Sequence, residues 1–561
     1  MTSAQLPYRW SSFLIFWAAA IPLGITSLAI EQLAQAQPIT PAADGTGTIV
    51  TPNGHRYNIS GGILSRDGAN LFHSLEQFGL EAGQIANFLS LPQIQNILGR
   101  VVGGEPSIIN GLLQVTGGNS NLYLMNPAGI VFGTNARLDV PAAFTATTAN
   151  GIGFGGSWFH AVGDNNYQAL LGNPNSFAFT INQPGSIVNA GELVIGEGNS
   201  ITLLSGIVIN TGTISAPGGE IAIAAVPGEN IVRISTDGML LNLELESVAG
   251  NNDSSLPRAG GINPPNLARL LTGGKLSNAT GVRVNPDGIV QLTGSSITLS
   301  DEAGTVIASG NLDVKSETGG RVNILGEKVG VFNASVNASG INGGGKVRIG
   351  GDYQGENTVP SAQQTFIDSN SFINADALLN GNGGRIIIWA DKVTRFYGRA
   401  SSKGGTHAGD GGLVEISGRE NLTFQGTVDT SSSNGNFGKL LLDPENIIIL
   451  EGIGDGDDLE PFFPTPFAFS GSPSGGLGKV LPNDTAPTVI FESELTALAA
   501  TNDILLQATN NITIEDLSDD FLGLAPSPSV PFLLQGSITL TAGGSFSMNQ
   551  GDTILTRERL K

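Results

Sequence analysis

Between residues 319 and 416, a pair of glycines followed by alternating apolar residues recurs four times. Each copy is six residues long. It begins with Gly-Gly and has apolar residues at the fourth and sixth positions of the copy. The copies span residues 319–324, 344–349, 383–388 and 411–416, so they begin 25, 39 and 28 residues apart. Alternation predicts a strand with one buried face, and glycine permits the sharp corner before it. A corner-and-strand repeat of this length predicts a parallel β-helix, in which each circuit of the chain lies on the one before.

Residues 186–250 carry a looser form of the same repeat. Asn-x-Gly corners at 189–191 and 210–212 lie 21 residues apart, with short apolar triplets between them. One circuit buries too few side chains to offset the entropy of ordering its backbone, so circuits are stable only when stacked. Glycine makes up 79 of the 561 residues and charged residues only 13%, which suits short strands and tight corners. We therefore predict an all-β chain that forms a right-handed parallel β-helix, a solenoid, with an N-terminal β cap.

The same patterns divide the chain into segments. The prediction is an N-terminal cap at 37–185, first coils at 186–250, a loop or excursion at 251–290, β-helix repeats at 291–450, a Pro/Gly/Asp-rich loop at 451–485 and further coils at 486–561. The excursion is predicted from prolines, which cannot donate to a strand ladder. The chain ends at Lys561 without a recognisable closing cap, and this suggests a short or truncated member of its class.

Residues 1–36 have the features of a secretory signal peptide. An arginine precedes the apolar stretch 13–30, and Ala34 and Ala36 form an Ala-x-Ala cleavage site, so the mature chain is predicted to begin at Gln37. The competing interpretation is a transmembrane anchor, but a proline and a glycine inside the apolar stretch weigh against it. No other stretch is long and apolar enough to span a bilayer, so we expect no stable transmembrane segment after the signal is removed.

Residues 121–133 are predicted to form strand, tight turn and strand. Asn126, Pro127 and Gly129 are the residue types that a type I turn prefers at its first, second and fourth positions. Alternating apolar residues lie on either side of the turn. Taken alone, this pattern indicates only a structural β-turn.

Together with three other landmarks, this turn resembles the Asn-Pro-Asn-Gly-Ile signature of the filamentous-haemagglutinin-type secretion domain. The landmarks are Asn-Leu-Phe-His-Ser at 70–74, Arg-Val-Val-Gly-Gly at 100–104 and Leu-Asp-Val at 138–140. Ala128 stands where the family usually has Asn, which removes a side-chain amide. The resemblance implies that the cap at 37–185 is the first part of the secretion domain and that the first coils at 186–250 complete it. It also implies that Asn126, Pro127, Gly129 and Ile130 form the secretion motif and act by shaping the cap.

Further along, the chain resembles cyanobacterial-type members of the haemagglutinin-like exoproteins. The matching segments are Ile-Trp-Ala-Asp at 388–391 and Leu-Leu-Leu-Asp-Pro at 440–444. The resemblance implies an exoprotein of two-partner secretion with a haemagglutination activity domain, secreted or displayed at the cell surface. It implies export through an outer-membrane Omp85-type β-barrel transporter, TpsB, whose periplasmic POTRA domains recognise the secretion domain. The expected role outside the cell is adhesion to a host-cell or polysaccharide receptor.

Composition excludes several other functions. A net charge of −22 argues against nucleic-acid binding and against docking on an anionic bilayer. The absence of cysteine excludes disulfides and thiolate metal sites, and it suits a chain that crosses a second membrane unfolded.

The sequence shows no constellation of residues typical of an enzyme or a metal site. Four histidines are scattered without metal-ligand spacing, and the acidic run 455–458 fails the calcium-loop pattern because Leu459 and Pro466 occupy ligand positions. No nucleophile elbow, zinc-protease or phosphate-loop motif is present. We therefore predict no catalytic residue, no cofactor and no metal site.

The alternative function is a β-helical carbohydrate-active enzyme, a polysaccharide lyase or hydrolase. Such chemistry needs carboxylates gathered on one face of neighbouring circuits. Glu415 with Asp429, or Glu415 with Asp391, are pairs that stacking would bring near each other, but nothing in the sequence singles them out.

Overall fold

A computed structural model describes most of the chain beyond the predicted signal segment. The described residues are 39–234, 243–248, 255–258, 260–273, 280–295, 297–356, 359–450, 488–515, 521–523, 536–550 and 552–555. The predicted cleavage site at Ala34, Ala36 and Gln37 and the predicted loop at 451–485 lie outside these ranges. Among the described residues, no helix is long and apolar enough to cross a membrane.

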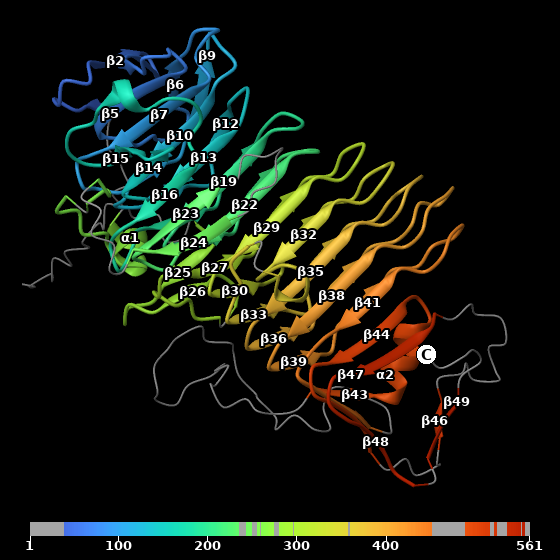
Figure 1. The fold of residues 1–561 in the computed structure, drawn as a ribbon. Coiled ribbons are helices and arrows are strands. Elements are labelled where there is room, and N and C mark those ends of the chain that lie inside the picture. The colour runs from blue at the N-terminus through green and yellow to red at the C-terminus, as the bar shows by residue number, and fades with distance from the viewer. Residues whose placement is uncertain are drawn as a thin grey trace, which may run out of the picture.

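Three parallel sheets wind around a common interior and form an elongated β-helix (Figure 1). Sheet A contains β5 (Asn70–Gln77), β7 (Asn96–Val101), β10 (Asn121–Met125), β13 (Phe144–Thr147), β19 (Ser200–Ser205), β22 (Glu220–Ala225), β29 (Arg321–Leu325), β32 (Lys346–Ile349), β35 (Arg385–Ala390), β38 (Leu413–Gly418), β41 (Lys439–Leu442), β44 (Asp503–Ala508) and β47 (Ile538–Ala542). At ~4.8 Å per step, these strands span roughly 60 Å along the axis. The predicted all-β, parallel β-helical fold is confirmed.

Between residues 96 and 429 the other two sheets follow sheet A in each coil, in the order A, C, B. Sheet C contains β8 (Ser107–Ile109), β11 (Ile130–Phe132), β17 (Ser186–Asn189), β20 (Ile207–Asn210), β27 (Thr305–Ala308), β30 (Lys328–Val331), β33 (Gln364–Ile367), β36 (Val393–Phe396) and β39 (Asn421–Phe424). Sheet B contains β2 (Thr48–Asn53), β3 (Arg56–Gly61), β6 (Ile85–Leu89), β9 (Leu112–Thr116), β12 (Arg137–Asp139), β18 (Glu192–Val194), β21 (Thr213–Ser215), β28 (Asn311–Asp313), β31 (Ser335–Asn337), β34 (Phe372–Asn374), β37 (Arg399–Ser401) and β40 (Thr427–Asp429).

Antiparallel strands close the N-terminal end of the stack. The hairpin predicted around residues 48–59 is confirmed as β2 paired with β3. Two short strands, β1 (Thr40–Pro41) and β4 (Ile63–Leu64), pair antiparallel with β5. These pairings occupy the edge that the first coil would otherwise expose, so the end of the stack is protected from pairing with another chain.

One apolar core runs through the interior of the helix. In β10, Leu122 and Leu124 point into this core, while Tyr123 and Met125 point outward. The same alternation continues in β29, where Val322 and Ile324 are fully buried. The core is shared from coil to coil, as the stacking argument requires.

The paired glycines are required by close packing between coils. A Cβ on Gly345 would clash with the carbonyl oxygen of Gly320, and a Cβ on Gly384 would clash with that of Gly345. Neither Gly345 nor Gly384 has a positive φ. The predicted positions of the corners are confirmed, but the predicted reason for these two glycines is wrong. They are required because a side chain would clash with the neighbouring coil, and not because the backbone needs a conformation that only glycine adopts.

Two insertions extend from the β-helix at the corner between sheets A and C. The first contains β14 (Gly151–Phe154), β15 (Ser157–His160), η1 (Tyr167–Ala169) and β16 (Ser176–Phe179). The second contains β23 (Asn230–Ile234), β24 (Leu243–Ser247), α1 (Leu267–Gly273), β25 (Val282–Val284) and β26 (Val290–Leu292). Strands β15, β14, β16, β23 and β24 form an antiparallel sheet, sheet D, which packs on the outer face of sheet A through Phe72, Met125 and Leu204. Helix α1 and the β25–β26 hairpin pack on the outer face of sheet C.

The structure differs from the predicted segments in three places. Coil strands already begin at β5, inside the segment predicted as the N-terminal cap, because residues 37–185 carry neither the Gly-Gly repeat nor the Asn-x-Gly corners from which coils were predicted. Strands β23 and β24 belong to sheet D and not to the first coils. The predicted loop or excursion at 251–290 contains helix α1 and strand β25, which pack against the outer surface of the β-helix.

The distal coils continue the stack with a second helix and short sheets. Strand β42 (Asn446–Leu450) pairs with β43 (Thr488–Phe491) and β45 (Asn511–Ile514), and β45 pairs with β48 (Phe546–Met548). Helix α2 (Glu492–Ala499) follows β43, and β46 (Phe521–Gly523) pairs with β49 (Thr553–Leu555).

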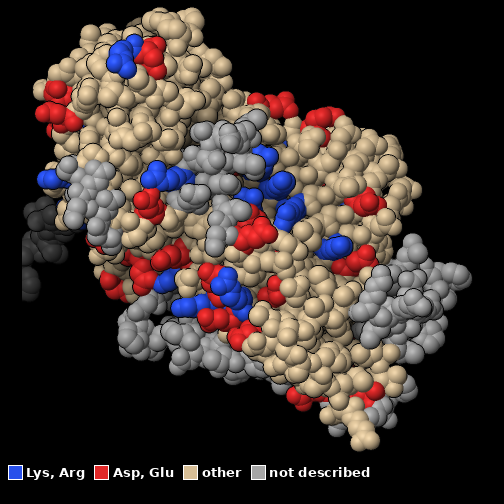
Figure 2. Space-filling model, viewed as in Figure 1, with Lys and Arg blue, Asp and Glu red and all other residues tan. Residues whose placement is uncertain are grey.

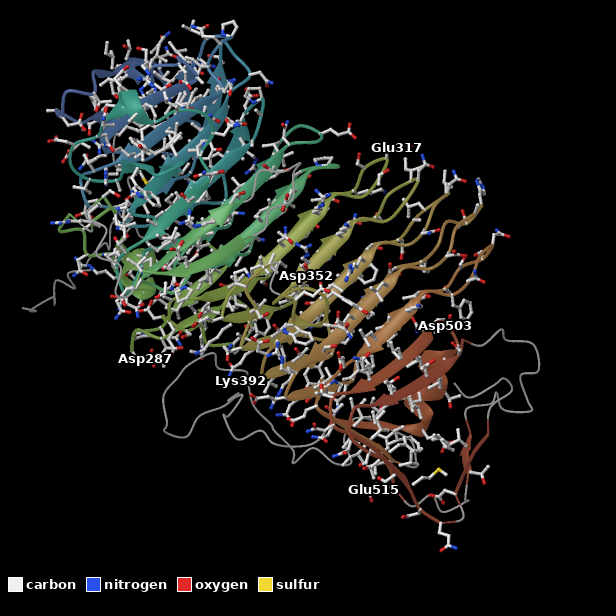
Figure 3. The ribbon with its side chains drawn as sticks, in the orientation of Figure 1. Asp287, Glu317, Asp352, Lys392, Asp503 and Glu515 are labelled. Atoms are coloured by element: carbon white, nitrogen blue, oxygen red, sulfur yellow. The ribbon has the colours of Figure 1, made fainter. Side chains whose placement is uncertain are left out.

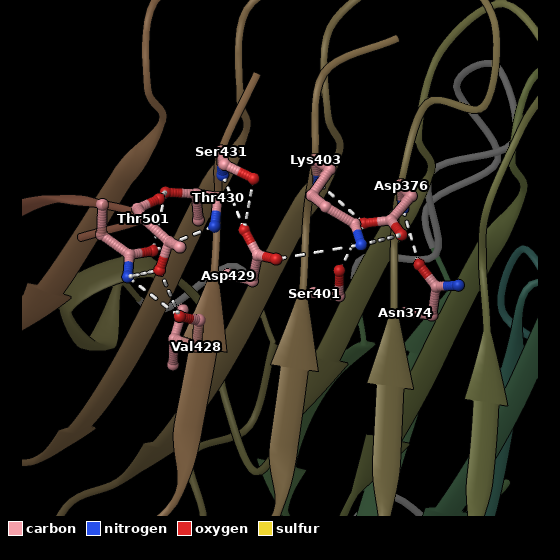
Figure 4. Close-up of polar contacts among 10 residues, drawn as sticks. Asn374, Asp376, Ser401, Lys403, Val428, Asp429, Thr430, Ser431 and Thr501 are labelled. Atoms are coloured by element: carbon pink, nitrogen blue, oxygen red, sulfur yellow. Dashed lines mark hydrogen bonds and ion pairs between the residues drawn. The ribbon is translucent and has the colours of Figure 1, made fainter. Parts of the chain in front are cut away.

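Polar side chains bind neighbouring distal coils together at the corner that follows sheet B (Figure 4). Asp376 accepts hydrogen bonds from the Ser401 hydroxyl at 2.6 Å and from the Lys403 amide at 2.7 Å. The Lys403 ammonium lies 3.9 Å from Asp376 and 3.8 Å from Asp429. Each corner therefore satisfies backbone groups of the next, in the way that Asx turns do.

Candidate functional site

The predicted motif turn forms the corner between β10 and β11. The Gly129 amide donates to the Asn126 carbonyl at 3.1 Å and closes the four-residue turn. The Asn126 side-chain oxygen accepts from the Ala128 amide at 3.0 Å, which adds an Asx turn inside the first. The β-turn predicted from the sequence is therefore present.

Asn126 also fastens this corner to the preceding coil. Its side-chain amide donates to the Glu105 carbonyl at 3.0 Å and to the Ser107 hydroxyl at 2.9 Å. The side chain is fully buried, and its oxygen and both donor hydrogens are in use. Removing the amide would leave buried polar groups of the corner before it without a partner.

The rest of the motif is buried as well. Pro127 and Gly129 lie inside the corner, and Ile130 points into the core. Gly129 has a φ of +121°, and a Cβ there would lie 3.2 Å from the Leu270 side chain of α1 and 3.2 Å from the Ser186 carbonyl oxygen. The four motif residues thus present no side chain to solvent in the folded chain, and their contacts are all structural.

Arg100, in the second landmark segment, joins four parts of the N-terminal region. Its guanidinium donates to the Ser74 hydroxyl at 3.0 Å, to the His160 and Gly163 carbonyls at 2.9 and 2.8 Å, and to the Asp44 carboxylate at 2.7 Å. Its side chain is only 3% exposed. Burial raises the pKa of Asp44, but hydrogen bonds from Ser74, Thr46 and Arg100 outweigh that effect and lower the pKa to about 2.

A ladder of asparagines crosses the start of three consecutive sheet A strands. Asn96 donates to Asn70 at 2.8 Å, and Asn121 donates to Asn96 at 2.8 Å. Asn70 in turn donates to the carbonyls of Leu170 and Gly172, both at 2.9 Å, and so holds the first insertion against the helix. Sequence reasoning missed both the ladder and the role of Arg100. The spacing of these asparagines, 26 and 25 residues, was the available signal.

The family model of the TPS secretion domain matches residues 36–260 of this chain. Residues 36–260 form a TPS secretion domain. The chain therefore carries the secretion domain of two-partner secretion exoproteins, of the filamentous-haemagglutinin type that the motif turn and its landmarks resemble.

Two solved secretion domains are similar to this chain. One is the HMW1 secretion domain from Haemophilus influenzae, at 22% identity and a TM-score of 0.40, covering 72% of this chain and 100% of that one. The other is the filamentous hemagglutinin secretion domain, at 14% identity and a TM-score of 0.27, with the same coverage. No curated protein matches the sequence. Nothing among these similarities supports the cyanobacterial attribution suggested by residues 388–391 and 440–444.

Within the secretion domain, His73 is a buried member of the first coil. Its Nδ1 lies 3.5 Å from the Thr48 hydroxyl, its ring lies 5.9 Å from that of Phe88, and its Nε2 has no hydrogen-bond partner among the described residues. Burial lowers the pKa of His73 to about 4, so the side chain is neutral at physiological pH. This environment is that of a core residue.

Beyond the secretion domain, the structure brings two acidic side chains together on the outer face of sheet A. The backbone N–H of Gln354 donates to both Glu415 carboxylate oxygens, at 3.0 and 3.1 Å. The side-chain amide of Gln354 donates to the Asp443 carboxylate at 3.2 Å. Burial raises the pKa of Glu415 to about 8. Both acids lie beneath the short turn η2 (Tyr353–Gly355) and are buried, so the pair is closed to a polysaccharide.

The carboxylate pairs suggested by the sequence have other partners. Asp391 pairs with Arg419 at 3.1 Å, and Asp429 accepts hydrogen bonds from the Ser431 amide and hydroxyl. Among the described residues, no group of three or more metal-binding side chains is close enough to hold an ion. The charges labelled in Figure 3, from Asp287 to Glu515, lie apart from one another along the middle and distal parts of the rod.

Proposed function

We propose that this chain crosses the outer membrane through a dedicated Omp85-type transporter and acts outside the cell as a non-enzymatic adhesin. The secretion domain at residues 36–260, joined directly to a long continuous β-helix, is the observation that supports this proposal. A β-helix offers long exposed faces on which a receptor-binding surface can be built. The closed position of the Glu415–Asp443 pair favours adhesion over polysaccharide cleavage.

The motif residues Asn126, Pro127, Gly129 and Ile130 contribute by shaping the secretion domain. Because they are buried, their effect on the transporter in the folded state is indirect: they fix the corner between coils and the surfaces around it. During passage, before the coils close, the same residues are accessible in the extended chain. Recognition by the POTRA domains then precedes folding of the cap.

Stepwise stacking supplies a driving force for export without a nucleotide-hydrolysing motor. Each coil that emerges adds hydrogen bonds to the preceding coil and extends the shared apolar core. Folding on the outer side opposes return through the transporter, because a stacked coil must unfold before it slides back.

The test of export is co-expression with the cognate transporter. Asn126→Ala is expected to reduce the extracellular fraction strongly, because it removes three hydrogen bonds from a buried corner. Asn374→Ala is the matched control: it also removes an Asx-turn oxygen, which accepts from Asp376 at 2.8 Å, but it lies outside the secretion domain. Equal extracellular amounts for the two variants would contradict the proposed role of the motif.

The adhesin role is tested separately, on protein recovered from the medium. The secreted chain is expected to bind cells or polysaccharide-coated surfaces saturably, while release of reducing sugar from the same polysaccharides stays at the level without protein. Saturable binding accompanied by progressive release would instead favour the enzyme alternative.

A further inference from the structure

Four basic side chains lie together on the outer face of sheet A, beyond the part covered by sheet D. Arg321, Lys346 and Arg385 occupy the same position on the consecutive strands β29, β32 and β35. Arg348 lies two residues beyond Lys346 on β32. Their neighbours along each strand point into the core, so these four side chains point outward. Figure 2 shows Lys and Arg side chains in a line across these middle strands of sheet A.

This basic row stands out in an acidic protein. The chain carries 26 basic and 48 acidic residues, yet four of the basic ones lie within three adjacent strands. Strand neighbours are ~4.8 Å apart, and like charges at directly paired positions destabilise a sheet. Burial and the nearby Arg321, Arg348 and Arg385 lower the pKa of Lys346, with Asp352 opposing them. Part of this charge is offset within the protein, because Glu220 lies opposite Arg321 and Arg348 pairs with Asp352. The exposed ammonium of Lys346, placed between Arg321 and Arg385 in the strand register, remains available to a bound anion.

The surroundings of the row limit what it can hold. Arg348 pairs with Asp352 at 3.1 Å, and the Arg385 guanidinium lies 4.6 Å from the centre of the Tyr353 ring, on turn η2. Asp352 is labelled over the middle of sheet A in Figure 3. Lys346 is exposed, and Tyr353 is half-buried. The row therefore offers guanidinium and ammonium donors next to an aromatic ring.

We propose that this basic row binds a linear anionic polysaccharide that carries one carboxylate on each sugar, lying along the axis of the β-helix. The proposal rests on the proposed adhesin function and names its ligand class. The rise from one coil to the next is of the same order as the rise per sugar in an extended uronate chain, so a chain lying along the axis brings carboxylates to more than one strand of the row. Arginine pairs with carboxylates through two parallel hydrogen bonds, and an aromatic ring packs against the apolar face of a sugar.

Other polyanions fit less well. Duplex nucleic acid and anionic membranes present a broad negative surface to the whole molecule, whose net charge of −22 repels them. A thin polysaccharide contacts only the row itself and stays within reach of its cations, while charges farther away are screened.

The test uses the full mature chain, with polygalacturonate as the probe, neutral dextran and dextran sulfate as comparisons, and affinity electrophoresis as the measurement. Polygalacturonate is expected to retard the protein, and the retardation is expected to fall steeply with added salt. Lys346→Glu, at an exposed position, and the double variant Lys346→Gln with Arg385→Gln are each expected to weaken binding about tenfold or more. The double variant Lys392→Gln with Arg399→Gln removes the same charge outside this face and is expected to stay within about twofold of wild type.

The outcomes separate this proposal from the adhesin function. Equal losses in the two double variants, equal retardation by neutral dextran, or retardation by dextran sulfate alone would each overturn the carboxylate site. Export and cell adhesion of the Lys346→Glu variant are measured in parallel. A variant that loses polygalacturonate binding but still adheres supports the site and assigns adhesion to another surface. A wild-type chain that binds polygalacturonate but adheres to no cell supports the site and contradicts the adhesin function.

Discussion

At the residue scale, Arg100 is the side chain on which most of the N-terminal packing depends. Arg100→Met is expected to lower the free energy of unfolding of this region by roughly 2–4 kcal/mol, because it removes the donor to two carbonyls and the charged partner of the Asp44 carboxylate. The measurement is denaturant unfolding of a chain that begins at Gln37 and carries Trp389→Phe, in which Trp158 of the secretion domain is the remaining tryptophan and its fluorescence is followed.

The matched control for Arg100 is Arg137→Met. Arg137 pairs with Glu192 at 3.0 Å, but its side chain is 44% exposed. An exposed ion pair of this kind contributes about 0–1 kcal/mol, so the control is expected to unfold near the wild-type midpoint. Equal shifts for the two variants would show that Arg100 does not hold the insertion to the helix.

His73 gives the secretion domain a pH dependence of known sign. Because burial lowers the folded-state pKa of His73 to about 4, below its ordinary 6.5, the unfolded chain binds the proton first. Stability is therefore lost as the pH falls from 6.5 towards 4, by roughly 3 kcal/mol in total. His73→Leu is expected to lack this component. The difference between the wild-type and variant unfolding free energies, measured from pH 7 to pH 4, should grow over that window. Parallel curves would contradict the prediction.

At the scale of elements, helix α1 is coupled to the motif turn through Gly129. Gly129→Ala is expected to cost roughly 1–2 kcal/mol more than Gly156→Ala. Both glycines have a similar positive φ, but a Cβ at Gly156 meets nothing within 4 Å, whereas one at Gly129 meets Leu270 and Ser186. The extra cost therefore measures the contacts with α1 and with Ser186 of β17 together.

A double-mutant cycle checks that coupling. Adding Leu270→Ala to Gly129→Ala should relieve part of the crowding, so the two costs are expected to be non-additive. Strictly additive costs would show that α1 does not press on the turn. Far-UV circular dichroism of each variant provides the control for loss of the helix itself.

The elements also show where sequence reasoning succeeds and where it fails. The β-helix and the motif turn can be predicted from the sequence because their signals are local. Alternating apolar residues, glycine pairs and turn-forming residues lie within a few positions of one another. The early coils were missed because residues 37–185 carry neither the Gly-Gly repeat nor the Asn-x-Gly corners. Asn70, Asn96 and Asn121 instead occupy the first position of successive strands. The packing of α1 and sheet D depends on contacts between residues 60 to 140 positions apart, as between Arg100 and His160 or Gly129 and Leu270. No local sequence pattern indicates such long-range contacts.

At the scale of the whole molecule, every coil rests on the one before it, so the order in which the chain emerges becomes the order in which it folds. The secretion domain is at the N-terminal end of the stack and carries the cap, so it provides the template on which later coils form. A chain without cysteine has no internal crosslink to prevent unfolded passage.

Unfolded passage makes a prediction that involves the entire rod. A small, rapidly folding domain with one disulfide, inserted at Asp287 in the exposed turn between β25 and β26 (Figure 3), should stop export, because the locked domain cannot thread through the transporter. The same insert with both cysteines changed to serine, or the original insert with reductant in the periplasm, should restore release. The extracellular fraction of each is measured by immunoblot against the N-terminal coils. Undiminished release of the oxidised insert would show that the chain does not cross as an extended polymer, and stacking outside the cell would then no longer account for its direction of travel.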